Sequence, residues 1–222
     1  MGDAAMTGMP STRPLTPRRM SLALTELAAR DRDLAHAIQA VGRPRLRTRE
    51  AGFPALLRII VEQQLSVASA RAIWGRLEGA LGTVTPARYL ALGEEGATNA
   101  GMSRPKHRYA TGLAYEIAAG RLDLEGLEAL EDEEAIATLT AIKGIGRWTA
   151  EIYLLSALAR PDVWPVGDLA IATATGCIKG LAARPGPKEL LAIGEAWRPW
   201  RAVAARLVWH YFRHEADTGT KV

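Results

Sequence analysis

The sequence predicts an all-α protein, and three observations lead to that class. Apolar residues recur at helical spacing along most of the chain, and no stretch shows sustained strand alternation with hairpin turns. Residues suited to helix N-caps precede several of these runs. A chain of 222 residues with 48% hydrophobic and 23% charged residues can bury a core of ordinary composition. A division into two helical lobes, with both chain ends in one lobe, fits this pattern, although the sequence alone does not fix it.

The amino-terminal half contains a tail followed by long helical patterns. Residues 1–20 are rich in Pro, Ser, Thr and Arg without an apolar run, so we expect a disordered tail and not a secretory signal. Apolar periodicity then predicts helices over Leu22–Val41, Phe53–Leu65, Val67–Leu81 and Arg104–Ala119. Ser66 and Ser103 are expected to cap the last two, and Thr85-Pro86 opens a further, short helix.

Further helical patterns fill the carboxy-terminal half. They cover Glu133–Ile142, Thr149–Leu158, Leu169–Ile178, Pro187–Ala196 and Pro199–Phe212. Asp132 is expected to cap the first of them. Neither a low-complexity linker nor an internal repeat interrupts the sequence, so we expect one helical core over residues 21–215 and a tail over residues 216–222.

Composition excludes several classes of site. The single Cys177 excludes an intramolecular disulfide and a four-cysteine iron–sulfur cluster, and it disfavours structural zinc. The four histidines lack metal-ligand spacing. No run approaches the roughly 18 apolar residues of a membrane span. The net charge of +4 only mildly favours a polyanionic partner.

Four arginines stand at alternate positions near residue 45. They are Arg43, Arg45, Arg47 and Arg49. These side chains either contact phosphate or form a solvated, self-repelling loop, and we slightly favour the solvated loop.

The stretch from Leu139 to Ala174 contains the chemically informative residues. Gly144 and Gly146, two apart between two helical patterns, permit a tight hairpin with close backbone approach to a ligand. The N–H groups of the next helix then point out of the turn, where an anion such as phosphate fits. By itself, this pattern indicates no more than a tight turn between helices.

Two other residues of this stretch allow a structural and a functional interpretation. Trp148, on the first turn of a helix, suits either the core or the wall of a pocket. Asp168 follows Pro165 and Gly167 at the start of an alanine-rich helix, where it suits an N-cap. The two interpretations of Asp168 are compatible, because an N-terminal position also stabilises a carboxylate anion.

Taken together, residues 139–174 resemble the helix-hairpin-helix and Gly/Pro–Asp signature of the DNA glycosylase superfamily that includes endonuclease III. Residues 144–150 look like the branch typified by 3-methyladenine DNA glycosylase II. The resemblance extends to Glu62–Val67, to Gly101–Lys106, and to Ala196–Arg201 with Trp209. It covers most of the chain, from Leu22 to Tyr211.

The resemblance implies a role for each matching position. Asp168 falls on the catalytic aspartate, and Gln64 falls on the wedge that fills the gap left by a flipped base. The positions that it places at the lesion pocket are Trp148, Trp209, Ile152 and Tyr153. The other positions that it places at DNA are Lys143, Gly144, Ile145, Gly146, Arg147, Thr149, Ser66 and Lys106. Family members often hold a monovalent cation through hairpin carbonyls, here those of Lys143 and Ile145, and no other metal and no organic cofactor are required.

Three departures from the family pattern stand out. Only about twenty tail-like residues precede the first helix, which suggests the compact form without the amino-terminal β-rich domain. The wedge is polar, whereas some relatives have leucine. A pocket tyrosine is replaced by Ile152, with Tyr153 adjacent but on another helical face.

The implied activity is base excision repair by a monofunctional, helix-hairpin-helix DNA glycosylase that hydrolyses the N-glycosidic bond of cationic N-alkyl purines. Lyase relatives carry lysine where Trp148 stands, so water is the expected nucleophile. Double-stranded DNA with damaged bases is the expected partner of a monomer that binds no membrane and acts in the cytoplasm, at the nucleoid if bacterial. The alternatives are a non-catalytic DNA-binding module and a glycosylase for deaminated or oxidised bases.

Overall fold

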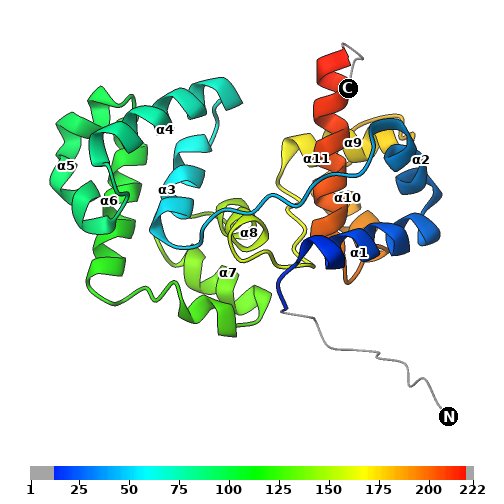
Figure 1. Ribbon diagram of the computed structural model, residues 1–222, viewed down its shortest axis with the longest axis horizontal. Coiled ribbons are helices and arrows are strands. Elements are labelled where there is room, and N and C mark those ends of the chain that lie inside the picture. The colour runs from blue at the N-terminus through cyan, green and yellow to red at the C-terminus, as the bar shows by residue number, and fades with distance from the viewer. Residues whose placement is uncertain (1–12, 219–222) are drawn as a thin grey trace. The chain divides into compact units, whose positions relative to one another are not determined.

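The structure is a computed structural model that describes residues 13–218. Within this range every regular element is a helix, which confirms the all-α class (Figure 1). Residues 1–12 of the expected amino-terminal tail and 219–222 of the carboxy-terminal tail lie outside the described range. The chain divides into two compact units: residues 48–158 form one, and the segments on either side of them form the other.

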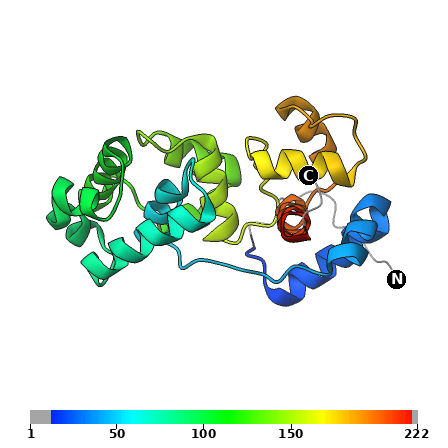
Figure 2. The ribbon, with the colours of Figure 1, turned by 90° about the horizontal axis from the view of Figure 1, so that it is seen from above.

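The unit that contains both ends of the chain is built around one long helix. Its helices are α1 (Pro17–Arg30), α2 (Arg32–Val41), α9 (Leu169–Ile178), α10 (Pro187–Glu195) and α11 (Arg201–Thr218). Figure 2 shows α11 nearly end-on, with α1 and α2 on one side and α9 and α10 on the other. Residues 202–208 of α11 are all buried and form the centre of this unit.

The amino-terminal helical pattern forms two helices where one was expected. Asp31 adopts an extended conformation between α1 and α2, and its carboxylate accepts hydrogen bonds from the N–H groups of Asp33 and Leu34. Apolar spacing continues through this break, so the periodicity did not reveal it. The first helix also begins earlier than expected, at Pro17, with Thr16 as its cap, so residues 17–20 are helical and Met20 is buried.

The second unit consists of α3 (Phe53–Glu62), α4 (Val67–Leu81), α5 (Pro86–Asn99), α6 (Arg104–Ala118), a 3-10 turn (Gly126–Ala129), α7 (Asp132–Thr140) and α8 (Arg147–Ser156). Helix α5 is longer than expected and bends at Gly93, where φ is 67°. Glu131, not Asp132, caps α7, and Ser103 makes no side-chain capping bond. Helix α3 packs against α4, α6 and α8 and thereby places the turn after α3 beside the turn before α8.

None of the described helices is long and apolar enough to cross a membrane. The described residues also contain no group of three or more His, Cys, Asp or Glu side chains placed to hold a metal ion.

Candidate functional site

The turn between α7 and α8 forms the expected hairpin, and its two glycines have different reasons to be glycine. Gly144 has φ of 94°, and a Cβ there would lie 2.2 Å from Cγ of Tyr109. Gly144 is therefore required by the fold. Gly146 has φ of −84°, which any residue adopts, and a Cβ there would meet nothing within 4 Å. The missing side chain of Gly146 leaves open surface at the start of α8, where the first N–H groups lack partners within the helix.

Arg147 and Thr149 hold the hairpin in place through their side chains. The guanidinium of Arg147 contacts Glu133 at 2.6 Å and Glu151 at 2.9 Å, and the hydrogen bond that it donates to the Glu133 carboxylate raises the pKa of Arg147. Thr149 is 2% exposed, and its hydroxyl accepts a hydrogen bond from Gln63 at 2.9 Å. The expectation that the Thr149 side chain contacts DNA is therefore corrected. The backbone N–H of Arg147 stays a candidate phosphate contact, while its guanidinium is paired with carboxylates.

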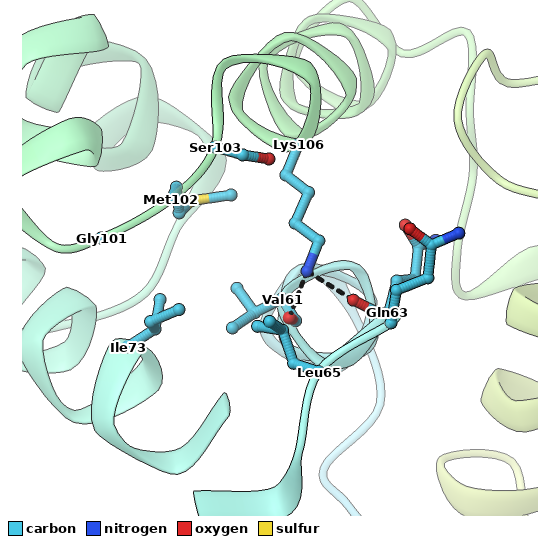
Figure 3. A pocket seen from close by; sticks show the side chains of 9 residues that line it. Val61, Gln63, Leu65, Ile73, Gly101, Met102, Ser103 and Lys106 are labelled. Carbon is cyan, nitrogen blue, oxygen red and sulfur yellow. Dashed lines mark hydrogen bonds between the residues drawn. The ribbon is translucent and has the colours of Figure 1, made fainter. Parts of the chain in front are cut away.

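The expected wedge lies in a sharp turn between α3 and α4. Gln64 is exposed and has φ of 54°, a left-handed conformation that is uncommon for a residue with a side chain. The helix expected to run to Leu65 ends at Glu62 because the chain leaves helical geometry here. Ser66, also exposed, caps α4 by accepting the N–H of Ser69 at 3.2 Å. A cavity of about 220 Å³ borders the turn on the side of α6 (Figure 3).

Lys106 supports this turn through hydrogen bonds to its backbone. Its Nζ donates to the carbonyl oxygens of Val61 at 2.8 Å and Gln63 at 2.6 Å, as Figure 3 shows. Burial lowers the pKa of Lys106. The Lys106 ammonium group is thus directed at the carboxyl end of α3, and the expectation that this half-buried residue contacts DNA stays a prediction.

Gln63 is a residue of the site that sequence reasoning missed. Its side-chain amide donates to the Thr149 hydroxyl at 2.9 Å and to the Gly144 carbonyl at 3.4 Å. The turn that carries Gln64 is thereby connected to the hairpin. The only signal in the sequence was its position next to Gln64.

Asp168 lies in the other unit, at the start of α9, and it is the N-cap that the sequence predicted. Its Oδ1 accepts the N–H of Ile171 at 2.9 Å and the indole Nε1–H of Trp209 at 3.2 Å. Trp209 is half-buried on α11, which packs directly against α9. Two candidate residues 41 positions apart in sequence are thus in direct contact.

The remaining pocket candidates are on α8. Trp148 is half-buried in its first turn, and Ile152 is buried with 8% of its surface exposed. Tyr153 is fully buried, burial raises its pKa, and its hydroxyl oxygen accepts the N–H of Gly52 at 2.9 Å. It therefore presents no accessible surface to a substrate, and its expected place in the pocket is corrected.

The alternating arginines are divided between structural contacts and solvent. Arg43 donates to the Ser21 carbonyl at 3.1 Å, and Arg49 pairs with Glu62 at 2.8 Å. Arg45 and Arg47 have exposed side chains. Arg43 and Arg49 therefore make contacts within the protein.

Comparison with known proteins places these residues in a family context. Residues 57–199 match the profile of the HhH-GPD superfamily of base excision DNA repair proteins. The chain is 31% identical over 190 residues to DNA-3-methyladenine glycosylase 1 of Schizosaccharomyces pombe, covering 82% of this chain and 83% of the relative.

Two solved structures are also similar. A DNA-3-methyladenine glycosidase from Bacillus halodurans is 35% identical, with a TM-score of 0.76 over 88% of this chain and 91% of that chain. A 3-methyladenine DNA glycosylase of S. pombe in complex with abasic DNA is 29% identical, with a TM-score of 0.79 over 88% of this chain and 97% of that chain.

Proposed function

The chain belongs to the HhH-GPD superfamily of base excision DNA repair proteins, and we propose that Asp168 is the carboxylate with which it releases alkylated bases from DNA. It is a DNA glycosylase, since the relatives it matches over most of their length are named DNA-3-methyladenine glycosylases. The proposed substrate is a cationic N-alkyl purine in duplex DNA. The proposed product is an intact strand with an abasic site.

The observation that carries the proposal is the fixed carboxylate of Asp168. Two donors hold Oδ1, the Ile171 N–H and the Trp209 indole, and the amino-terminal end of α9 stabilises the negative charge. Cleavage of an N-glycosidic bond builds positive charge on the sugar. A carboxylate that is already oriented stabilises that charge without reorganisation, and it can also orient or deprotonate the attacking water.

Aromatic side chains suit the other requirement of the reaction, a pocket for the flipped base. Unstacking a nucleotide costs a few kcal/mol and less for a damaged one, while stacking on an aromatic ring returns roughly 1–3 kcal/mol. A cationic alkylated base also favours an electron-rich ring. We assign this stacking to Trp209, which is half-buried and donates its indole N–H to Asp168. Trp148, half-buried on α8, stays a further candidate.

The hairpin is the proposed phosphate contact. The open surface at Gly146 and the first N–H groups of α8 suit an anion, and Lys143 is exposed beside them. A monovalent cation held by the carbonyl oxygens of Lys143 and Ile145 stays a prediction. Binding of damaged duplex as a monomer, in the cytoplasm, is likewise proposed.

Excision assays with Asp168→Asn test the proposed chemistry. Duplexes that each carry one 7-methylguanine, uracil or 8-oxoguanine are incubated with enzyme, and abasic sites are converted to strand breaks with hot alkali. We expect the wild type to act on 7-methylguanine and Asp168→Asn to lose at least about 10²–10³ in rate, while duplex affinity is retained.

Asp217→Asn is the matched control, because Asp217 is exposed on the same unit. Circular dichroism verifies that both variants are folded. Near wild-type excision by Asp168→Asn would contradict the catalytic role and leave Asp168 only as the cap of α9. If the wild type prefers uracil or 8-oxoguanine, the substrates are deaminated or oxidised bases instead.

A further inference from the structure

We propose that Lys106 and Gln63 are positioning residues that fix the Gln64 wedge to the phosphate-binding hairpin. Together they hold the turn after α3 in the shape that presents Gln64. This inference rests on the proposed function, because it takes Gln64 as the side chain that fills the gap left by a flipped base.

The turn needs support because of its backbone. Gln64 has φ of 54°, and residues with side chains rarely adopt this conformation unless surrounding contacts impose it. The turn also follows the carboxyl end of α3, where the last carbonyl groups have no partners within the helix. Two external contacts meet these needs.

The first contact comes from α6. Lys106 extends from the first turn of α6 so that its ammonium group donates to the carbonyl oxygens of Val61 and Gln63, at 2.8 and 2.6 Å (Figure 3). A cation is favourable at the negative end of a helix dipole. Lys106 therefore caps α3 and fixes the residue that immediately precedes Gln64.

The second contact leads to the hairpin. The side chain of Gln63 donates to the Thr149 hydroxyl at 2.9 Å and to the Gly144 carbonyl at 3.4 Å. Thr149 is in the first turn of α8 and is 2% exposed, so the acceptor is itself firmly held. One residue, Gln63, thus receives the cap from α6 through its backbone and connects to the hairpin through its side chain.

Phosphate binding and wedge position are coupled by this arrangement. When the hairpin binds the backbone of DNA, Gln64 is already set at a fixed offset from it, without an ordering cost at the moment of flipping. The benefit applies to a lesion that must be removed from a stacked pair. It is small for a lesion that is already unpaired, because that base costs least to flip.

A pair of duplexes tests this coupling with Lys106→Met, which keeps the apolar stem and removes the charge. In one duplex 7-methylguanine is paired, and in the other it is a single-nucleotide bulge. We expect the single-turnover rate on the paired lesion to fall at least about tenfold, because the two charge-assisted hydrogen bonds to the Val61 and Gln63 carbonyls are lost, and the rate on the bulge to change less than about twofold. Gln64→Ala should show the same selective loss.

Lys188→Met is the matched control, since Lys188 is exposed on α10 in the other unit, and both of its rates should equal those of the wild type. Equal loss of both rates in Lys106→Met, or no loss, would overturn the positioning role. Should Lys106→Met fail to fold, Gln63→Met decides by the same criterion, because it removes the amide donors and keeps the backbone carbonyl. Wild-type enzyme that releases 7-methylguanine from neither duplex would overturn the proposed function itself.

Discussion

Trp209→Phe isolates the hydrogen bond between the indole and Asp168. The substitution removes the Nε1–H that lies 3.2 Å from Asp168 Oδ1 and keeps an aromatic ring at the same place on α11. Asp168 then retains the N–H of Ile171 at 2.9 Å as a donor to Oδ1. The carboxylate should become less well oriented while stacking on the base is largely preserved.

The size of the effect follows from the geometry of this bond. A hydrogen bond to a charged group contributes about 1.5–3 kcal/mol, and a length of 3.2 Å with a half-buried donor places this one at the lower end. A loss of about 1–2 kcal/mol corresponds to about 5- to 30-fold in rate. The loss should be smaller than that of Asp168→Asn, which changes the anion itself.

Single-turnover excision of 7-methylguanine and binding of the same duplex are the two measurements. We expect the rate constant to fall and the dissociation constant to change little. Trp200→Phe is the matched control, because the Trp200 indole donates to the Glu26 carboxylate at 2.7 Å, at a site distinct from Asp168. An unchanged rate constant, with or without a rise in the dissociation constant, would refute the orienting role and leave Trp209 as a stacking residue.

Three further predictions concern the hairpin and the nucleophile. Gly144→Ala should lower the free energy of unfolding by roughly 2 kcal/mol or more, because its Cβ would lie 2.2 Å from Tyr109 Cγ. Gly146→Ala should keep wild-type stability, since its Cβ would meet nothing within 4 Å of the protein, and should weaken duplex binding. Thermal denaturation measures the stability of both variants, and fluorescence anisotropy measures their binding to duplex DNA. Unimpaired binding by Gly146→Ala would contradict the phosphate role. Borohydride added during turnover should trap no covalent adduct, because lyase chemistry needs a neutral amine near the sugar and Lys179 is paired with Asp31 at 2.7 Å. A trapped protein–DNA adduct on a gel would contradict the monofunctional assignment.

The sequence by itself determined the features that depend on neighbouring residues. Helix class and several helix ends follow from apolar spacing and capping residues, so Val67–Leu81 and Leu169–Ile178 match their expected bounds at both ends. The N-cap role of Asp168 was predictable because its acceptor reaches an N–H only three residues away. Recognition of the family came from residues 139–174, where those short-range features occur together.

Only the tertiary structure decided which side chains face a ligand and which hold the site together. Lys106 resembles a DNA-binding lysine in sequence, but it caps a helix that ends more than 40 residues earlier. Gln63 meets Thr149 across 86 positions, and Tyr153 turns its hydroxyl toward Gly52 across 101. The pairing of Trp209 with Asp168 likewise depends on how α11 packs against α9. Periodicity assigns a residue to the buried face of a helix, but the partner on that face depends on the packing of distant segments.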